Sequence, residues 1–479
     1  MTKNIIINLL FLVSFIIAAP VSQNINVPED DKNNFEITKL AMKFVEEVEE
    51  KIEEKNGTYS VEDQTRRKLE HMNNSYNENL FVKPMENPYL FQGDEVLTEE
   101  QAENIVKEAA EEARNYEVDL SNLFSDSEII RKKRKIEKKE NAKWEFPIKY
   151  YVQGVNETLV DKSLKLIENE TCIRFMKVYG PTYKQPGLKY FSGNGCWSFV
   201  GRKSPDQFQD ISIGNGCTSV GTVQHETMHA LGSTHEQCRA DRDEFLTIYK
   251  DNFRYGTDKN FVKLDISNAI TYNIKYDYGS DMHYALDSFT KNGRPTMLPN
   301  NRLFVKTIGT NSGLSFLDVK LLNLYYCSQN FTKIRCYNGG YPDPNNKTKC
   351  KCVEGYAGDN CIQLPKPNDG CNTTFYHATK DAKNITLNGE KDCLYHLKAP
   401  HGMKINITIV HSMFDYSSEY TCMKGNSLEI KFISDKTPTG ALFCSENRNV
   451  SIISEKDHAI VHYRTPFWSS KMNVIFHAI

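Results

Sequence analysis

No cysteine occurs in the sequence before Cys172, although 13 cysteines follow between that position and Cys444. A front without cysteine cannot be stapled by disulfides, whereas the rest of the chain has the cysteine content of proteins from an oxidising compartment. The length of 479 residues also exceeds what one hydrophobic core normally serves, and it favours about three domains. The sequence therefore predicts a mosaic with a cysteine-free front and a disulfide-rich back.

The sequence also lacks an excess of charge of either sign. Its 59 Lys and Arg and 62 Asp and Glu residues leave a formal net charge of -3 at pH 7. Binding to nucleic acid or to an acidic surface depends on a strongly basic face. The composition therefore gives no reason to expect a nucleic-acid partner.

Hydrophobic runs long enough to cross a membrane are missing. The apolar run from Ile5 to Ala19 follows Lys3 and ends in two small residues. Because about 15 residues fall short of the roughly 20 that a spanning helix needs, we interpret residues 1–19 as a signal peptide rather than a membrane anchor. Asn-X-Ser/Thr sequons, spread from Asn56 to Asn449, agree with a secretory route and with glycosylation. We expect a secreted protein without a membrane span.

The front segment, residues 20–134, contains two helical patterns separated by a turn. In the first pattern, apolar residues recur at helical spacing on a Glu- and Lys-rich background: Ile37, Leu40, Ala41, Phe44, Val48 and Ile52. The second pattern begins at Thr98, which can form a capping box with Gln101. Between the two lies the turn Phe-Gln-Gly-Asp, which ends at Asp94.

The front segment ends in the basic run RKKR, from Arg131 to Arg134. An exposed run of this kind is a target for processing proteases of the secretory pathway. The other interpretation, a nuclear-localisation signal, does not fit a secreted chain, which never meets the nuclear import machinery. We expect an activating protease to cut after Arg134.

The rest of the chain divides into three parts. β-like runs and at least one helix, from Trp144 to about Cys327, predict a domain of mixed α and β structure. Four cysteines and many Gly, Pro and Asn residues then fill residues 336–361, and a segment with so few apolar residues depends on disulfides. From Cys371 to Ile479, the period-two runs KINITIVH and SLEIKFIS predict a β-sandwich.

The stretch VQHETMHALGSTHE places three histidines at the spacing of metal ligands. His225 and His229 are four residues apart, so on a helix both can bind one Zn²⁺ at about 2.0 to 2.1 Å. Gly232 can adopt a positive φ, which ends the helix and turns the chain so that His235 arrives as a third ligand. Three neutral nitrogens leave the metal a position for water, as in catalytic rather than structural zinc sites.

Glu226 follows the first of these histidines, so it lies beside the metal without facing it directly. Zinc lowers the pKa of a bound water to about 7, and a carboxylate base can then take a proton from that water. The expected product is a hydroxide aimed at a carbonyl.

The motif from His225 to Glu236 and the later run YDYGSDMHY resemble the astacin metalloproteases of the metzincin group. The resemblance covers residues 144–327 and implies a zinc endopeptidase with an α+β catalytic domain around an active-site helix. It assigns Met282 to a methionine turn beneath the zinc. It implies that Tyr284 is a further zinc ligand that swings away to stabilise the oxyanion. It also implies that Glu236 contacts the new N-terminus, which is buried after activation.

The same resemblance gives Asp94 a role. In astacin prodomains a Phe-x-Gly-Asp turn lays its aspartate on the zinc in place of the catalytic water, and Phe91, Gly93 and Asp94 match that turn. Gly93 permits a close backbone approach, and an anionic oxygen is a good zinc ligand at about 2.0 to 2.2 Å. We therefore expect a zymogen that Asp94 holds latent until cleavage near Arg134.

The resemblance also implies disulfide pairs and the nature of the last two parts. Residues 336–361 resemble an EGF-like module that lacks one pair of cysteines, and the tail resembles a CUB domain. The implied pairs are Cys172–Cys327, Cys196–Cys217, Cys336–Cys350, Cys352–Cys361, Cys371–Cys393 and Cys422–Cys444. Cys238 is left over, as a buried bystander, an intermolecular bridge or a reactive thiol.

These expectations describe a multidomain chain of the roundworm astacin type. Its parts are a signal peptide (1–19), a helical prodomain (20–134), a catalytic domain (135–328), a disulfide-rich EGF-like module (329–365) and a β-sandwich CUB domain (366–479). The expected cofactor is one Zn²⁺ per catalytic domain. By analogy with secreted astacins of this architecture, the expected substrates are proteins or peptides of extracellular matrix, cuticle or egg coat.

Two other functions fit parts of the sequence. A binding protein could keep the protease fold and lose turnover, although Glu226 and Tyr284 are both present. A purely structural zinc would favour four Cys or His ligands rather than three histidines. Many relatives carry an arginine where this chain has Asn311, near the pocket for an acidic substrate residue just after the cut. Without that arginine, a preference for acidic residues at this substrate position does not follow.

Overall fold

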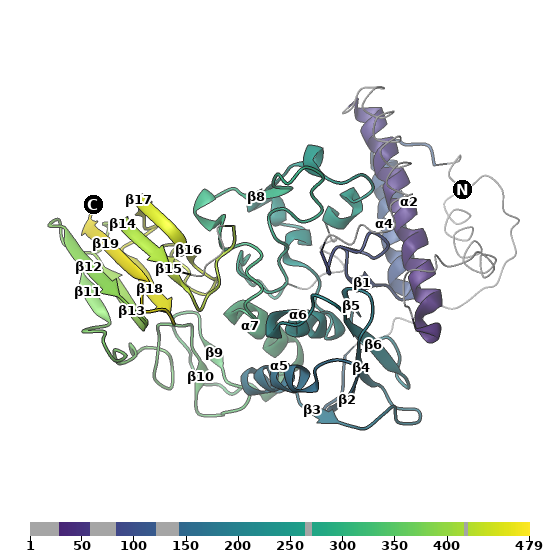
Figure 1. The fold of residues 1–479 in the computed structure, drawn as a ribbon, viewed down its shortest axis with the longest axis horizontal. Coiled ribbons are helices and arrows are strands. Elements are labelled where there is room, and N and C mark those ends of the chain that lie inside the picture. Colours follow the sequence, from purple (N-terminus) through teal and green to yellow (C-terminus); the bar gives the residue numbers. More distant parts are fainter. Residues whose placement is uncertain (1–27, 58–82, 121–142, 264–270, 416–419) are drawn as a thin grey trace, which may run out of the picture.

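The computed structural model describes residues 28–57, 83–120, 143–263, 271–415 and 420–479. The expected signal peptide and the basic cleavage site lie outside these residues. Figure 1 shows three regions in a row: two helices of the front segment at one end, a mixed α/β region in the middle and a β-sandwich at the other end. The multidomain architecture predicted from the sequence is confirmed.

In the front segment, helix α2 (Lys32–Asn56) packs against α4 (Glu99–Asn115), and a short 3-10 helix, η1 (Glu29–Asp31), precedes them. Five of the six residues of the stripe expected on α2 belong to one buried cluster with apolar residues of α4, whereas Leu40 is only partly buried. The hydroxyl of Thr98 accepts a hydrogen bond from the Gln101 N–H at 3.4 Å, and Gln101 Oε1 accepts one from the Thr98 N–H at 2.9 Å. The predicted capping box at the start of α4 is therefore confirmed.

A six-stranded sheet forms the core of the middle region, in the order β1-β5-β6-β4-β2-β3. Its strands are β1 (Glu95–Val96), β2 (Ile148–Gln153), β3 (Phe175–Lys177), β4 (Gly187–Phe191), β5 (Cys196–Phe199) and β6 (Phe208–Ile213). Only β5 and β6 pair antiparallel. Strand β1 comes from the front segment, with Glu95 opposite Ser198 and Val96 opposite Phe199. The front segment thus extends the sheet by one short strand.

Three α-helices accompany this sheet: α5 (Glu157–Glu170), α6 (Val220–Ala230) and α7 (Phe316–Tyr326). Helix α6 lies between α5 on one side and strands β5 and β6 on the other. Strands β7 (Leu246–Ile248) and β8 (Met297–Pro299) form a second sheet. The connecting 3-10 helices are η3 (Glu236–Cys238), η4 (Arg242–Glu244), η5 (Lys250–Asn252), η6 (Asp258–Phe261), η7 (Arg302–Phe304) and η8 (Ser328–Asn330).

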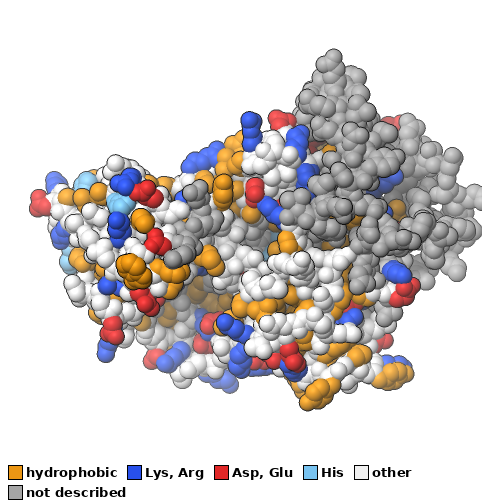
Figure 2. Space-filling view, viewed as in Figure 1, with side chains coloured by type: hydrophobic (Ala, Val, Ile, Leu, Met, Phe, Trp, Pro, Cys, Tyr) orange, Lys and Arg blue, Asp and Glu red, His pale blue; other side chains and the backbone are white. Residues whose placement is uncertain are grey.

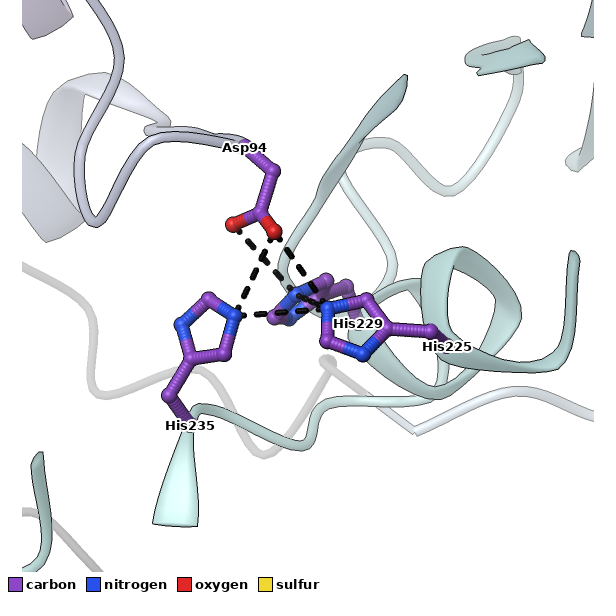
Figure 3. A group of neighbouring side chains, drawn as sticks. All are labelled: Asp94, His225, His229 and His235. Carbon is purple, nitrogen blue, oxygen red and sulfur yellow. Dashed lines mark hydrogen bonds and ion pairs between the residues drawn. The ribbon is translucent and has the colours of Figure 1, made fainter. Parts of the chain in front are cut away.

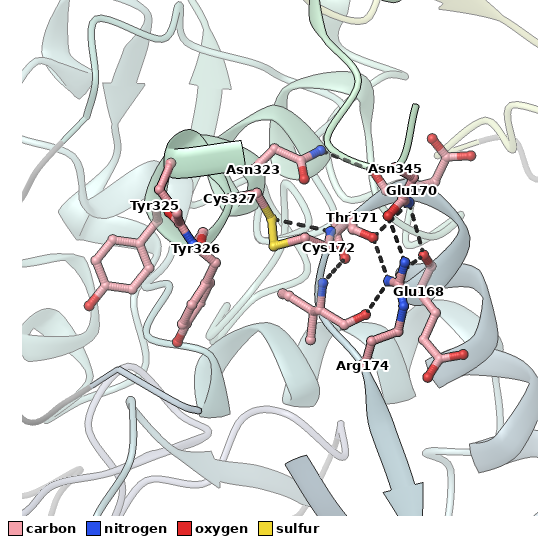
Figure 4. Close-up of a disulfide and its surroundings, with 12 residues drawn as sticks. Glu168, Glu170, Thr171, Cys172, Arg174, Asn323, Tyr325, Tyr326, Cys327 and Asn345 are labelled. Carbon is pink, nitrogen blue, oxygen red and sulfur yellow. Dashed lines mark hydrogen bonds between the residues drawn. A yellow bond between two sulfur atoms is a disulfide. The ribbon is translucent and has the colours of Figure 1, made fainter. Parts of the chain in front are cut away.

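Six disulfides are formed, and they are the pairs that the family resemblance implies: Cys172–Cys327, Cys196–Cys217, Cys336–Cys350, Cys352–Cys361, Cys371–Cys393 and Cys422–Cys444. Figure 4 shows the first of them joining the end of α7 to the segment after α5. Beside it, Arg174 donates to the carbonyl of Thr171 at 2.7 Å and to Oδ1 of Asn345 at 2.6 Å. Because Asn345 belongs to the small module, this arginine ties that module to the middle region.

The small module contains one short hairpin, β9 (Tyr341–Pro342) with β10 (Cys350–Lys351), and two of the six disulfides. The hydroxyl of Tyr341 accepts a hydrogen bond from Asn323 of α7 at 2.9 Å. So little regular structure agrees with the sequence expectation that disulfides hold this module together.

The tail is a sandwich of two sheets, as its resemblance to a CUB domain predicts. One sheet, in the order β11-β13-β18-β15-β16, contains β11 (Phe375–His377), β13 (Lys391–Lys398), β18 (His458–Thr465), β15 (Ser427–Lys431) and β16 (Ala441–Phe443). The other, in the order β12-β19-β14-β17, contains β12 (Lys383–Asn388), β19 (Lys471–Ala478), β14 (Ile405–Phe414) and β17 (Ser445–Ile453).

Strand β15 differs from the period-two pattern expected of it, because all five of its residues are buried. Its outward-facing Glu429 accepts hydrogen bonds from the Gly440 N–H at 2.7 Å and from Arg464 at 3.3 Å. Lys431 donates to the carbonyl of Pro438 at 2.8 Å. The loop before β16 covers this face, so hydrophobic alternation is replaced by paired polar groups.

The described surface carries mixed charge. Figure 2 shows Lys and Arg side chains interspersed with Asp and Glu over the visible face. Among the residues whose placement is described, no helix is both long and apolar enough to cross a bilayer.

Candidate metal centre

Helix α6 positions the first two histidines. Ser219 caps its start, accepting a hydrogen bond from the Thr222 N–H at 2.9 Å, and the helix then continues to Ala230. The rings of His225 and His229, one turn apart, have centroids 4.8 Å apart and are almost fully buried. Burial of such polar side chains calls for a partner at each ring nitrogen.

The chain turns at Gly232, whose φ of 100° is a left-handed conformation that glycine adopts without strain. This turn brings His235 to the other two histidines, as the sequence predicts. Nε2 of His225 lies 3.1 Å from Nε2 of His229 and 3.3 Å from Nε2 of His235 (Figure 3). Three imidazoles from one short stretch therefore converge on one point.

The partners at the Nδ1 atoms show that this point suits a cation. Nδ1 of His225 faces the carbonyl of Asp281 at 2.7 Å, and Nδ1 of His229 faces the carbonyl of Ser233 at 2.9 Å. Since a carbonyl can only accept, each Nδ1 carries the hydrogen and each Nε2 presents a lone pair. Lone pairs at 3.1 to 3.3 Å repel one another unless a positive charge lies between them. The residues thus fit the zinc that the motif implies.

Asp94 completes the group. Its Oδ2 lies 3.3 Å from Nε2 of both His225 and His235, and its Oδ1 lies 3.6 Å from Nε2 of His229. Figure 3 shows the carboxylate of Asp94 pointing at the three rings. These four side chains place their ligand atoms within 4.8 Å of one another. The three histidines and Asp94 together can therefore hold a metal ion.

The turn before Asp94 depends on glycine. Gly93 has a φ of 81°, and a Cβ atom there would lie 2.6 Å from both the carbonyl oxygen of Met85 and the ring of Phe289. Any other residue would therefore clash with the backbone as well as adopt a strained conformation. The sequence prediction that Gly93 allows the aspartate to approach closely agrees with this geometry.

Glu226 lies in the same helix and is fully buried. Neither carboxylate oxygen has a hydrogen-bond partner among the described residues. Burial, followed by the nearby charge of Asp94, raises the pKa of this carboxyl well above its ordinary value. A buried carboxyl without a described partner, beside three converging histidines, is a candidate for acid–base chemistry.

Tyr284 lies beside the histidines, and Met282 is buried two residues earlier in the chain. The hydroxyl of Tyr284 donates a hydrogen bond to the carbonyl of Gln92 in the front segment, and its ring centroid is 4.6 Å from that of His235. Met282 is buried in the core cluster of the middle region, and its carbonyl accepts from the Glu236 N–H at 2.9 Å. Tyr284 therefore lies beside the histidines but contacts the front segment.

Two residues next to Asp94 were not predicted from the sequence to act at this centre. Oε1 of Gln92 lies 2.8 Å from Nδ1 of His235. Oε1 of Glu95, fully buried, lies 3.3 Å from Nδ1 of His235 and 3.4 Å from Nδ1 of His229. The signal that could have found them is their polarity within an otherwise apolar stretch, because Leu90, Phe91, Val96 and Leu97 are all buried.

Glu236 and Cys238 lie just past the third histidine. Glu236 accepts hydrogen bonds from Arg239 at 3.1 Å and from the Asp277 N–H at 2.9 Å, and burial raises its pKa to about 8. The chain terminus that it is expected to meet lies outside the described residues. Cys238 is fully buried and its Sγ donates to the carbonyl of Asn260 at 3.5 Å, while burial raises the pKa of its thiol. A buried thiol of this kind fits the bystander interpretation.

Comparisons with known proteins agree with this geometry. The family model described as Astacin, a family of peptidases, matches residues 136–327. Zinc metalloproteinase nas-34 of Caenorhabditis elegans is 37% identical over 388 residues, which cover 80% of this chain and 63% of the relative. Zinc metalloproteinase nas-36 of Brugia malayi is 31% identical over 400 residues, covering 79% of this chain and 68% of the relative.

Among solved structures, high choriolytic enzyme 1, a hatching enzyme zinc-protease from Oryzias latipes, is 32% identical. It covers 40% of this chain and 92% of its own, with a TM-score of 0.34. The chain spans 63%, 46% and 48% of the lengths of three nematode relatives, nas-34, nas-37 and nas-30. On the family match and the identity shared with nas-36, the chain belongs to the astacin family of peptidases.

Proposed function

We propose that the protein is a secreted zinc endopeptidase that hydrolyses peptide bonds of extracellular proteins. The observation that carries this proposal is the convergence of three Nε2 lone pairs, from His225, His229 and His235, with Glu226 one residue after the first ligand. Open three-histidine sites of this kind are catalytic rather than structural. Membership of a peptidase family supports the same activity.

The chemistry follows from the residues present. The three histidines would hold zinc, which would supply Lewis acidity and lower the pKa of water at the centre to about 7. Glu226 would take a proton from the attacking water and return it to the leaving amine, acting first as a general base and then as a general acid. Tyr284 donates a hydrogen bond to the oxyanion that develops on the carbonyl. Burial raises the pKa of its phenol well above the ordinary value, so Tyr284 stays a donor at neutral pH.

The front segment holds this centre latent. Asp94 occupies the position that the water needs, and the carbonyl of Gln92 takes the hydrogen bond of Tyr284. Residues 92–94 therefore engage the hydroxyl of Tyr284 and lie where the water would act. Activation is proposed to require a cut near Arg134 by another protease.

The remaining parts determine where the enzyme acts. Six disulfides support secretion into an oxidising compartment, where the signal peptide (1–19) would direct the chain. We assign residues 135–328 to catalysis, 329–365 to an EGF-like spacer and 366–479 to a CUB domain that selects substrate or location. Proteins of matrix, cuticle or egg coat are the proposed substrate classes.

The test is hydrolysis of a mixed peptide library by the purified chain beginning at Lys135. Glu226→Ala is the control, because it keeps the three histidines while removing the base. Hydrolysis that the variant lacks supports a metal-dependent peptidase, and the cut sites report its specificity. If neither protein hydrolyses any peptide, the result would contradict the proposed activity and favour a protein-binding role.

A further inference from the structure

One face of α2 is built to contact the middle region. Glu46, Glu50 and Glu53 are spaced at i, i+4 and i+7, so they follow one side of the helix. All three partners lie in residues 250–259 of the middle region. The pairs are Lys259 Nζ with Glu46 at 3.8 Å, the Tyr255 hydroxyl donating to Glu50 at 2.7 Å, and Lys250 Nζ with Glu53 at 2.8 Å.

The contact is close and partly dry. A Cβ atom on Gly256 would lie 2.7 Å from Oε1 of Glu46, so the helix presses on the backbone of this segment. The side chain of Lys259 is only 9% exposed, whereas that of Lys250 is 48% exposed. Partly exposed pairs of this kind remain sensitive to salt.

Glu49 lies on the same helical face, between these pairs. Its Oε2 is buried without a hydrogen-bond partner in the described structure. Burial, and then the charge of Asp258, raises its pKa to about 8, against the opposing effect of Lys250. Glu53 and Glu112 also raise it. Glu49 therefore remains largely protonated at neutral pH, so it adds no uncompensated charge to the contact.

The front segment holds the middle region at other points too. Its Phe35, Leu90 and Val96 form one buried cluster with three aromatic residues of the sheet, Phe191, Trp197 and Phe199. Strand β1 pairs with β5, and Glu86 forms an ion pair with Arg254. The peptide bond after Arg134 lies outside the described residues, and none of these contacts includes it.

We propose that the front segment remains bound after that cut, with residues 250–259 as the docking site for the acidic face of α2. This inference rests on the proposed zymogen. The cut is then necessary but not sufficient for activity, and the freed front segment is a non-covalent inhibitor of the same chain. Activity follows only when the front segment dissociates or is itself degraded. Loss of the covalent link lowers its effective concentration and so makes inhibition dependent on dilution.

The test uses the full chain with residues 131–134 replaced by the recognition sequence of a site-specific protease. After cutting, size-exclusion chromatography at low salt and at about 1 M salt, where the Debye length is about 3 Å, reports whether the fragments co-elute. At low salt the two fragments should co-elute and the protein should be inactive. On dilution or at high salt the fragments should separate and hydrolysis should appear. Fragments that separate at low salt, with activity rising in step with the cut, would overturn the inference.

Two matched triple variants locate the docking site. Glu46→Gln, Glu50→Gln and Glu53→Gln together should raise the dissociation constant of the cut front segment by about 10- to 100-fold. Glu36→Gln, Glu47→Gln and Glu54→Gln remove as many charges from the same helix, but none of these residues forms an ion pair with the described residues of the middle region. This set should change the dissociation constant by less than about threefold. Equal effects of the two sets would overturn the assignment to residues 250–259.

The outcomes separate this inference from the proposed latency. Activity in the uncut chain would contradict the proposed latency. An uncut chain that is inactive, but whose fragments separate as soon as it is cut, would contradict only the proposed docking. Co-elution needs no catalysis, so it decides the docking even for a protein without measurable hydrolysis.

Discussion

The hydroxyl of Tyr284 donates its hydrogen bond to the main-chain carbonyl of Gln92, two residues before the carboxylate that faces the three histidines. One turn of the front segment therefore lies at the position proposed for the catalytic water and engages the hydroxyl proposed to stabilise the oxyanion. The backbone N–H of Tyr284 is fixed as well, because it donates to Oε1 of Gln237 at 3.0 Å. Only the side chain of Tyr284 is free to change partners when the front segment leaves.

Tyr284→Phe should lower kcat of the chain beginning at Lys135 by about 10²-fold, with little change in KM. The physical reason is that the phenol acts on charge that develops in the transition state, and loss of one such donor typically costs about 10² to 10³ in kcat. Steady-state kinetics on one fluorogenic peptide measures the effect. A rise in KM at constant kcat would instead assign Tyr284 to substrate binding.

Asp94→Ala should allow the uncut chain to hydrolyse a short peptide that the unmodified uncut chain leaves intact. We expect an increase of about tenfold or more, the change that loss of a single contact of 1.4 kcal/mol already produces. Glu95→Gln is the matched control, because it replaces a buried carboxyl at the next position and keeps Asp94; this variant should remain inactive. If Asp94→Ala is as silent as its parent, the aspartate does not block the centre.

A histidine pair makes the contact between the small module and the sandwich sensitive to acid. The rings of His396 and His458 stack at 10°, with Nδ1 of His396 3.0 Å from Nε2 of His458. Nε2 of His396 also faces the carbonyl of Gly355, in the small module, at 2.7 Å. Burial, and then Lys436, lowers the pKa of His458 to about 3, and burial lowers the pKa of His396.

These depressed pKa values fix the sign of the pH effect. Unfolded histidine titrates near 6.5, so below that pH the unfolded chain binds more protons than the folded chain. The stability contributed by the pair is present above about pH 6.5 and is lost as the pH falls towards 3. Denaturant unfolding should show a loss of roughly 1 to 3 kcal/mol between pH 7 and pH 4. In His458→Gln the loss should be smaller, and an unchanged profile would contradict this account.

The sandwich forms hydrogen bonds to Asp277, which lies five residues before Met282. The carboxylate of Asp277 accepts hydrogen bonds from the Thr439 N–H at 3.0 Å and from its hydroxyl at 3.3 Å. Thr439→Val removes only the second bond and should lower the free energy of unfolding by about 0.5 to 1.5 kcal/mol. Thr379→Val, at an exposed hydroxyl of the same module, should change it by less than about 0.5 kcal/mol. Equal values for both variants would show that the contact contributes nothing.

Much of the centre could be predicted from the sequence because its geometry is local. His225, His229 and Gly232 are fixed by the period of one helix and by the φ of one glycine. The capping box at Thr98 depends on residues three positions apart, which is why sequence reasoning located the start of α4. Local rules of this kind need no knowledge of the rest of the fold.

Other features depend on contacts between distant parts of the chain. Nothing in the two residues of β1 predicts that they extend a sheet, because the pairing partner Ser198 lies about a hundred positions away. The complete burial of β15 likewise results from a loop that covers its outer face. Gln92 and Glu95 could be assigned to the centre only once the turn had been placed against His235. In each case, contacts between distant parts of the chain determine the structure, and the hydrophobic periodicity of the sequence does not reveal such contacts.

The measurement that tests the account most directly is zinc titration of the chelator-stripped chain beginning at Lys135, with activity and bound metal followed together. The account predicts that activity rises in proportion to bound zinc and saturates at about one ion per chain, the occupancy of a single three-histidine site. It also predicts that Glu226→Ala binds the same amount of zinc without gaining activity. Hydrolysis by the zinc-free chain, or full activity in Glu226→Ala, would contradict it.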